Sequence, residues 1–596
     1  MPTAKRQAVR RTGPGRERPR ASSRVAGHAA VAAPVPQPHS QSWALYAVAA
    51  IASLAIAFWA YSPALHGPFL FDDSYLPFAL PNFNASLGPW IHGARPLLMV
   101  TYWLNVQLSG TDTYSFHVVN VFLHLISSAL MFFVLRRLLE WASIDPSRRN
   151  LLAGFGAAVF LLHPMQTEAV AYLAGRSDGF SVLLLLASYS VFLYRRTAAV
   201  SWITAFLVLF IFGASVLAKE HTIVLPALLL LTDYWWNPGF SFAGIRRNWR
   251  LYGLTALGAL AGIAILLPLI RGGDNAGFGM KDLTWYQYFF TQCRALFVYP
   301  ALFLLPAGQS ADWNFPMSKT IFDHGALFGL IALIALAALA WRFRREYRLA
   351  SFGFFAYLLL MAPTSSILPI RDAVAERRLY LSMLGLLLIV IDFLSRIRIE
   401  RKILVPACAV ILVTLAGATY ARAAVWSSEV ALWQDTVRKS PNDWRARFQL
   451  GSAWFDEGRC DLANQEFEYA NKLRPPDYGL LVDWGLALDC LNQPDAALAK
   501  LRQAAALNAT AHVYSQIATV YGKRSQWPQA LEALSTAEKI DPNFAATYVY
   551  RGNVHLATND PVAATRDYQR ALSLDPTLIP ALNGLKQAQA RLSARR

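Results

Sequence analysis

The chain has 596 residues, of which 55% are hydrophobic and only 15% are charged, and its mean hydropathy is +0.31. Ordinary globular proteins carry roughly 25% charged residues, so this composition argues against a chain of soluble domains and indicates a membrane protein. The net charge of +18 would normally suggest a nucleic-acid partner. In a membrane protein, however, Lys and Arg collect in the cytoplasmic loops, and no nucleic-acid partner is predicted.

Residues 1–40 contain eight Lys and Arg residues and a single acidic residue, Glu17, without any periodic apolar pattern. Such a segment cannot bury enough apolar surface to offset its ordering entropy, so we predict a disordered basic cytoplasmic tail. A nucleic-acid-binding arm is the alternative interpretation. The tail is favoured because an uncharged stretch long enough to cross a bilayer, residues 42–62, follows at once.

Residues 41–425 are predicted to form a polytopic membrane helix bundle with about eleven spans. The predicted spans cover residues 42–62, 115–138, 150–163, 178–195, 199–217, 221–236, 252–270, 322–341, 350–368, 379–395 and 403–421. The apolar segment 285–304 contains Arg294 and Pro300, so it is predicted to be a helix at the interface or buried among the others.

The basic residues predict the orientation of this bundle. With a cytoplasmic N-terminus, the tail and the inner loops hold 25 Lys and Arg residues, whereas the outer loops hold ten. This bias favours an odd number of spans, with everything after Arg422 outside. We therefore predict a multi-pass protein of a bacterial inner membrane, with its C-terminal region periplasmic or otherwise extracytoplasmic.

Residues 426–596 are soluble in character and repeat with a period of about 34 residues. Small residues recur at Gly451, Gly485, Ala518 and Gly552, and Ala463, Ala497, Ala530 and Ala564 are each followed four residues later by a bulky residue, Phe467, Leu501, Leu534 or Tyr568. This pattern is typical of tetratricopeptide repeats, and it predicts an all-α solenoid of about four repeats with a capping helix over 578–594.

The repeats provide a concave surface suited to a peptide or protein segment, although a spacer or assembly surface is an equally good interpretation. Cys460 and Cys490 lie near the turns of adjacent repeats, and an oxidising exterior would permit a disulfide between them. The sequence leaves open whether that bond forms.

Ionisable residues at the ends of apolar helices are energetically costly and need a reason. The predicted topology places four such groups on the outer face: Asp72 and Asp73; His163, Glu168, Arg176 and Asp178; Lys219 and Glu220; and Arg371, Asp372, Glu376, Arg377 and Arg378. Each group alone has an ordinary structural interpretation, such as an Asx turn, an interhelical hydrogen bond, a charged turn or a basic patch at lipid headgroups. His163 and Glu168 are five residues apart, which does not fit a zinc site on one helix face, and no metal ligands are predicted.

Together, carboxylates and cations at one membrane face suit a transferase whose donor is anchored in the membrane by a lipid phosphate. Arg or Lys would stabilise a polyprenyl phosphate leaving group, and a carboxylate would take the proton of the attacking hydroxyl. A single displacement would invert the configuration of the sugar carbon. A channel or transporter with the same charges is the alternative at this point.

Several short motifs resemble one known family. They are Phe69–Asp73, Arg95–Leu97, Phe116–Asn120 with His124, His163–Val170, Gly175–Asp178, Ala218–Glu220, Pro363–Ser365 and Ala375–Leu381, followed by Trp426, Glu429 and Trp433 at the entry to the repeats. In this order, over about residues 43–577, they resemble the transmembrane and tetratricopeptide repeat containing O-mannosyltransferases. The resemblance implies a GT-C glycosyltransferase fold with its site on the lumenal or periplasmic side.

The resemblance further implies a lipid-phosphate sugar donor and no required cofactor, although a divalent metal is left open. By this analogy, Asp72 or Asp73 is the base or positions the acceptor. Arg176, Lys219 and Arg377 would bind the donor phosphate, with His163, Glu168, Asp178, Glu220, Glu376 and Arg378 supporting them. The abundance of Ala and Arg and the compact loops indicate a bacterial protein, so the donor would be a bacterial polyprenyl phosphate.

The leading hypothesis is thus an inverting membrane glycosyltransferase that acts on a Ser or Thr hydroxyl of an exported protein, with the repeats as a possible acceptor-binding region. Two alternatives stay open. One is a transferase for a cell-envelope glycan or lipid, and the other is a non-enzymatic membrane anchor that presents a tetratricopeptide scaffold.

Overall fold

The computed structural model describes residues 43–79, 85–93, 95–259 and 276–594. The predicted tail over residues 1–40 and the end of the predicted span 252–270 lie outside these ranges. The described residues form helices and no strand, apart from an isolated bridge between Ala276 and Ile370. The prediction of an all-α fold is confirmed.

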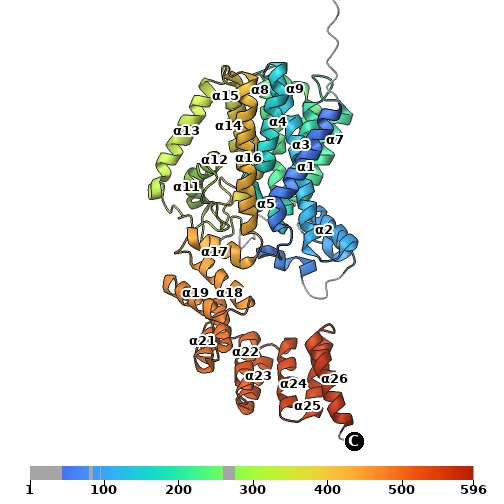
Figure 1. The fold of residues 1–596 in the computed structure, drawn as a ribbon, viewed down its shortest axis with the longest axis vertical. Coiled ribbons are helices and arrows are strands. Elements are labelled where there is room, and N and C mark those ends of the chain that lie inside the picture. The colour runs from blue at the N-terminus through green and yellow to red at the C-terminus, as the bar shows by residue number, and fades with distance from the viewer. Residues whose placement is uncertain (1–42, 80–84, 94, 260–275, 595–596) are drawn as a thin grey trace, which may run out of the picture. The chain divides into compact units, whose positions relative to one another are not determined.

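Ten of the predicted spans coincide with helices of the structure (Figure 1). These are α1 (Trp43–Tyr61), α3 (Thr113–Trp141), α4 (Pro146–Leu162), α6 (Arg176–Leu193), α7 (Trp202–Ala218), α8 (Leu225–Trp236), α13 (Ala326–Arg342), α14 (Arg348–Met361), α15 (Leu379–Arg396) and α16 (Arg401–Val425). In the described ranges, six helices are long and apolar enough to cross a membrane, those that contain α1, α3, α6, α13, α15 and α16, and α7 and α14 are shorter apolar helices. The count of eleven spans stays a prediction.

Short helices connect these long ones. They include α2 (Pro96–Ser109), α5 (Thr167–Ala171) and α9 (Ala243–Arg247), and the predicted helix over 285–304 consists of two, α11 (Trp285–Ala295) and α12 (Val298–Leu304). Single 3-10 turns carry two of the charged motifs, η2 (Phe71–Tyr75) and η9 (Glu376–Arg378).

Helices α14 and α15 pack with their backbones in contact. A Cβ atom added to Gly385 would lie 2.4 Å from the carbonyl oxygen of Gly353, and one added to Gly353 would lie 2.5 Å from the carbonyl oxygen of Gly385. In a bilayer, where lipid tails are as apolar as side chains, small residues at such a crossing allow the close approach that drives helix association.

The C-terminal helices form successive antiparallel pairs (Figure 1). The pairs are α18 (Trp444–Asp456) with α19 (Cys460–Leu473), α20 (Tyr478–Cys490) with α21 (Pro494–Leu507), α22 (Ala511–Lys523) with α23 (Trp527–Ile540), and α24 (Ala545–Ala557) with α25 (Pro561–Leu574), followed by α26 (Ile579–Ser593). Helix α17 (Glu429–Lys439) lies between α16 and the first pair. The tetratricopeptide array and its final helix are as predicted.

The recurring small residues of the repeats face the recurring bulky ones. A Cβ atom on Gly451 would lie 2.6 Å from the ring of Phe467, and one on Gly552 would lie 2.7 Å from the ring of Tyr568. Phe467 and Tyr568 are fully buried. The sequence period therefore reflects one packing contact, repeated between the two helices of each pair.

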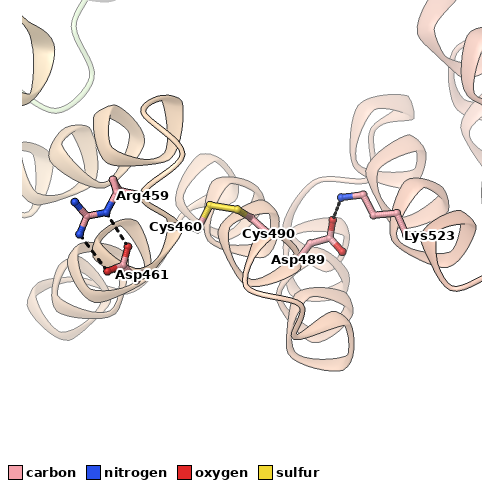
Figure 2. The surroundings of a disulfide bond; sticks show 6 residues. All are labelled: Arg459, Cys460, Asp461, Asp489, Cys490 and Lys523. Atoms are coloured by element: carbon pink, nitrogen blue, oxygen red, sulfur yellow. Dashed lines mark hydrogen bonds and ion pairs between the residues drawn. A yellow bond between two sulfur atoms is a disulfide. The ribbon is translucent and has the colours of Figure 1, made fainter.

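Cys460 and Cys490 form a disulfide, which the sequence left open. It joins the start of α19 to the end of α20, across the boundary between the first two repeats (Figure 2). Asp489, beside it, forms an ion pair with Lys523 of the third repeat at 2.5 Å. The first two repeats are thus linked covalently, and the next is joined to them by a charge pair.

We expect Gly385→Ala to destabilise the bundle by about 1–3 kcal/mol, because its methyl group would overlap the backbone of α14. The melting temperature of the detergent-solubilised protein measures this effect. Gly417→Ala is the matched control, since a Cβ atom there meets open space and Ala favours a helix. Equal melting temperatures for the two variants would contradict the close helix crossing.

We expect Cys490→Ser to destabilise the first two repeats by about 2–4 kcal/mol, because the disulfide closes a loop between residues 30 positions apart. Limited proteolysis of the full chain, read out at sites between residues 444 and 507, would detect the loss. Cys408→Ala, at a buried free cysteine of α16, serves as the control. Addition of a reductant to the wild-type chain should have the same effect as Cys490→Ser, and resistance to reductant would contradict the expectation.

Candidate functional site

A cavity of about 570 Å³ lies between loops of the membrane bundle and the first helices of the repeat region. It is open to solvent and carries both charges and aromatic rings. Its lining includes Phe71, Asp72, Tyr75, Glu168, Tyr172, Asp312, Arg371, Asp372, Arg377, Trp426, Glu429, Trp433, Arg445 and Gln449. Three of the predicted site residues, Asp72, Glu168 and Arg377, meet in this cavity.

The turn η2 presents its two carboxylates in opposite ways. Asp73 is buried, and its carboxylate accepts hydrogen bonds from the backbone N–H groups of Leu70, at 3.0 Å, and Ala174, at 2.7 Å. Burial raises the pKa of Asp73 to about 7, although these backbone hydrogen bonds partly oppose the shift. Asp73 thus ties the loop after α1 to the segment before α6.

Asp72 is exposed and lines the cavity. Its backbone N–H donates to the hydroxyl of Tyr172 at 3.0 Å. Within the described residues its carboxylate has neither a hydrogen bond nor an ion pair. The structure therefore separates two neighbours that the sequence left equivalent: Asp72 is available to a ligand, and Asp73 is held by the scaffold.

Glu168 and Arg377 form an ion pair at the edge of the cavity. The carboxylate of Glu168 accepts both the backbone N–H of Arg377, at 2.8 Å, and its guanidinium. Glu168 is nearly inaccessible, whereas a third of the Arg377 side chain is exposed. This geometry aligns the guanidinium and leaves part of it free to face the cavity.

Arg371 also lines the cavity, and its side chain is exposed. Among the residues that the structure describes, Arg371 makes no ion pair and no hydrogen bond. Arg371 belongs to the fourth predicted charged group, but the sequence does not show which of the arginines in that group is paired. The structure reveals it as an uncommitted guanidinium in the same cavity as the uncommitted carboxylate of Asp72.

Arg176 does not line the cavity. Its side chain is fully buried and donates to the side-chain oxygens of Asn120, at 2.8 Å, and Asn105, at 2.9 Å, and to two backbone carbonyls. It also lies over the ring of Tyr102, 4.5 Å from its centroid. Contact with a donor phosphate, as predicted from the sequence, would require these hydrogen bonds to break, so this position is structural.

Lys219 and Glu220 form two separate ion pairs outside the cavity lining. The ammonium group of Lys219 lies 2.7 Å from the carboxylate of Asp178, and Glu220 pairs with Arg95 at 2.6 Å. Lys219 also donates to Ser177 at 3.1 Å. The predicted phosphate-binding role of Lys219 finds no counterpart in this geometry, because its charge is neutralised by Asp178 at a distance from the cavity wall.

His163, Glu376 and Arg378 fasten loops together. His163 accepts the backbone N–H of Met165 and contacts the carbonyl oxygen of Phe303 at 3.0 Å. Glu376 accepts from the side chain of Gln309, at 2.7 Å, and from a backbone N–H at 2.6 Å. Arg378 donates to two backbone carbonyls and a tyrosine hydroxyl. Their predicted supporting role is consistent with these contacts.

An aromatic wall lines one side of the cavity. The ring centroid of Phe71 lies 4.8 Å from that of Trp433 and 5.8 Å from that of Tyr172, which stacks on Trp426 at 5.8 Å. Aromatic faces of this kind suit the apolar faces of sugars and peptide side chains. Only the family resemblance points to Trp426 and Trp433, because nothing in their spacing predicts a contact with Phe71.

In the described part of the chain, no group of three or more His, Cys, Asp and Glu side chains has a geometry that could hold a metal ion. Three carboxylates of the cavity, Glu168, Asp312 and Asp372, are instead paired with arginines.

The fold and the site thus define a polytopic membrane protein with a tetratricopeptide array whose first helices border a charged cavity. Comparisons with known proteins agree with this class. The tetratricopeptide repeat family matches residues 515–579. Part of the chain is similar to the crystal structure of MamA, at 22% identity over 25% of this chain and 86% of that one, with a TM-score of 0.23. It is also similar to the crystal structure of YrrB, a tetratricopeptide protein with an unusual peptide-binding site, at 20% identity over 30% of this chain and 89% of that one, with a TM-score of 0.23.

Among curated proteins, the chain is similar to the protein O-mannosyl-transferase TMTC3 of Mus musculus, at 25% identity over 81% of this chain and 57% of that protein. It is also similar to the protein O-mannosyl-transferase TMTC1 of Homo sapiens, at 24% identity over 64% of this chain and 48% of that protein. The chain spans about half the length of these relatives. The resemblance drawn from its motifs is confirmed: its homologues are transmembrane and tetratricopeptide protein O-mannosyl-transferases.

We expect Asp73→Ala to lower the melting temperature of the purified protein, because it leaves two backbone donors without their acceptor, at about 1–3 kcal/mol for each buried donor. Asp72→Ala is the matched control one residue away, and it should leave the melting temperature unchanged. The reverse order of stability would show that the two carboxylates have exchanged roles.

Proposed function

We propose that the chain is an inverting membrane glycosyltransferase of GT-C type, which transfers a sugar from a polyprenyl-phosphate donor to a Ser or Thr hydroxyl of an exported protein. The observation that carries the proposal is that one cavity with an aromatic wall holds both an uncommitted carboxylate, Asp72, and an uncommitted guanidinium, Arg371. The names of its homologues support transfer to protein.

The chemistry is a single displacement at the anomeric carbon. The acceptor hydroxyl attacks this carbon and transfers its proton to Asp72, while the bond between the carbon and the phosphate oxygen breaks. The polyprenyl phosphate leaves with the bonding electrons, and the configuration of the carbon inverts. A positioned general base of this kind typically accelerates a reaction by roughly 10²–10⁴-fold.

The negative charge that develops on the leaving phosphate requires a cation within hydrogen-bond reach. Arg371 fits this role, and Arg377, already aligned by Glu168, provides a second guanidinium on the same cavity wall. Guanidinium groups bind phosphate through bidentate, charge-assisted hydrogen bonds. Of the three residues predicted to bind the donor phosphate, we therefore keep Arg377 and add Arg371, whereas Arg176 and Lys219 hold the scaffold.

In this proposal arginine supplies the charge stabilisation, and transfer needs no divalent metal. Activity that persists in excess EDTA is the expected result. Activity that disappears with EDTA and returns with Mg²⁺ or Mn²⁺ would assign the leaving-group charge to a metal.

The acceptor reaches the cavity from the side of the repeats, so we place this face outside the cytoplasm of a bacterial inner membrane and the N-terminus inside. The disulfide between Cys460 and Cys490 supports an oxidising compartment for the repeats. A cell-envelope glycan or lipid as the acceptor is the second enzymatic candidate, and a non-enzymatic scaffold is the third.

The direct test is transfer of radiolabelled sugar from a polyprenyl-phosphate donor by the purified full-length chain. We expect Asp72→Asn to lower kcat by roughly 10²–10⁴-fold, because the amide cannot accept the proton. We expect Arg371→Gln to raise KM for the donor by roughly 10-fold or more and also to lower kcat, because a charge-assisted hydrogen bond to the phosphate is lost in the bound donor and in the transition state.

The acceptor is tested in parallel with peptide, glycan and lipid acceptors. Label on the peptide alone supports the proposed function, and label on the glycan or lipid alone supports the second candidate. Undiminished transfer by Asp72→Asn, with a wild-type melting temperature, would remove this carboxylate from the mechanism.

A further inference from the structure

Arg445 of α18 reaches from the first repeat into the cavity and binds two loops of the membrane bundle. Its guanidinium donates two hydrogen bonds of 2.5 Å to the carboxylate of Asp312 and one of 3.1 Å to the carboxylate of Asp372. All three residues line the cavity. Asp312 follows α12, whereas Asp372 precedes η9, so a single side chain joins two loops that are far apart in the sequence.

Asp312 is buried more deeply than Arg445 and Asp372. The Asp312 side chain is only 7% exposed, whereas those of Arg445 and Asp372 are about 40% exposed. A buried carboxylate needs a partner, because leaving its charge unpaired costs several kcal/mol. Arg445 supplies that partner to Asp312, and its remaining hydrogen bond fixes Asp372.

A second contact holds the same loop. The ammonium group of Lys439, at the end of α17, donates to the backbone carbonyl oxygen of Gln309, whose side chain in turn donates to Glu376 at 2.7 Å. Helices α17 and α18 therefore hold the loop before Asp312 at two points. The loop that carries Asp372 is held at the same residue by Arg378, which donates to the backbone carbonyl oxygen of Asp372 at 2.6 Å.

The position of Asp372 has a consequence for its neighbour Arg371. An unpaired Asp372 would compete with a donor phosphate for the guanidinium of Arg371, and with Asp312 it would add negative charge to a cavity that binds an anion. Arg445 binds Oδ1 of Asp372, and Arg371 has no partner among the described residues.

We propose that Arg445 is a positioning residue of the active site, which keeps Arg371 available to the donor phosphate, so that the first repeat is part of the catalytic cavity. This inference rests on the proposed function. It assigns to helix α18 a role in donor binding that is separate from any role of the later repeats in holding the acceptor.

The test compares Arg445→Gln with Arg447→Gln in the full-length chain. Arg447 lies two residues after Arg445 on the same helix and is also ion-paired, but its partner is Glu466 of the same repeat, at 2.8 Å. We expect Arg445→Gln to raise KM for the donor by roughly 10-fold with kcat changed by less than about 3-fold, a loss of the size seen for coupled charge pairs. Arg447→Gln should leave both constants unchanged.

Rescue separates positioning from direct contact with the phosphate. In the double variant Arg445→Gln with Asp372→Asn, the carboxylate that competes for Arg371 is gone, and KM for the donor should return to within about 3-fold of the wild-type value. A KM that stays raised in the double variant would overturn the proposal, because it would show that Arg445 does not act by binding the carboxylate of Asp372.

A third measurement does not depend on transfer. Hydrogen exchange of backbone amides over residues 307–318 and 370–376 should accelerate at least several-fold in Arg445→Gln and not in Arg447→Gln. Unchanged exchange would overturn the inference whatever the kinetics. If the wild-type chain transfers no sugar, the proposed function fails, and unaltered binding of a polyprenyl phosphate by Arg445→Gln would then overturn the inference as well.

Discussion

The buried guanidinium of Arg176 organises the end of the bundle that borders the cavity. It lies at the start of α6, and its acceptors come from α2 and α3, so one fully buried cation joins three helices. A charge in such a place is stable only when its hydrogen-bonding capacity is met by the protein. The segment that precedes Arg176 includes Ala174, whose N–H binds Asp73, and Tyr172, whose hydroxyl accepts from the backbone of Asp72. The turn that presents Asp72 thus depends on the placement of Arg176.

The same requirement sorts the charges in and around the cavity into two kinds. Glu376, Asp178 and Asp73 are buried and Lys219 is partly buried, and all four are bound to partners and hold elements in place. Asp72 and Arg371 are exposed and, among the described residues, have no partner for their charges. Pairing stabilises a fold but uses up the hydrogen bonds that a substrate needs, so the residues open to chemistry are those that the scaffold leaves alone.

Local sequence patterns predicted most of the architecture, since the helices and repeats follow from composition and spacing. Uncharged segments of about 20 residues mark the long helices. The small residue and the bulky residue that recur in each repeat, such as Gly451 and Phe467, contact each other inside that repeat. The choice between Asp72 and Asp73 could not be predicted, because neighbouring residues differ only in which distant N–H groups meet them. The structural roles of Arg176 and Lys219 could not be predicted for the same reason, because the sequence shows that a cation is present but not which distant residue it binds. The pair of Arg445 and Asp312 joins residues 133 positions apart, a separation that no periodicity spans.

The start of the repeat array is fixed to the bundle by charges and by chain length together. Only three residues separate α16 from α17, and Arg422 of α16 binds Asp435 of α17 at 2.8 Å in a nearly inaccessible pair. Short connections allow little rotation, and a buried ion pair leaves a large penalty if it opens. A solenoid transmits the orientation of its first repeat to the next through each interface. The disulfide strengthens the first of these interfaces, so the surface of the second repeat is oriented by contacts made at the cavity. A protein segment bound along the array would therefore approach Asp72 from a direction that the membrane bundle itself determines.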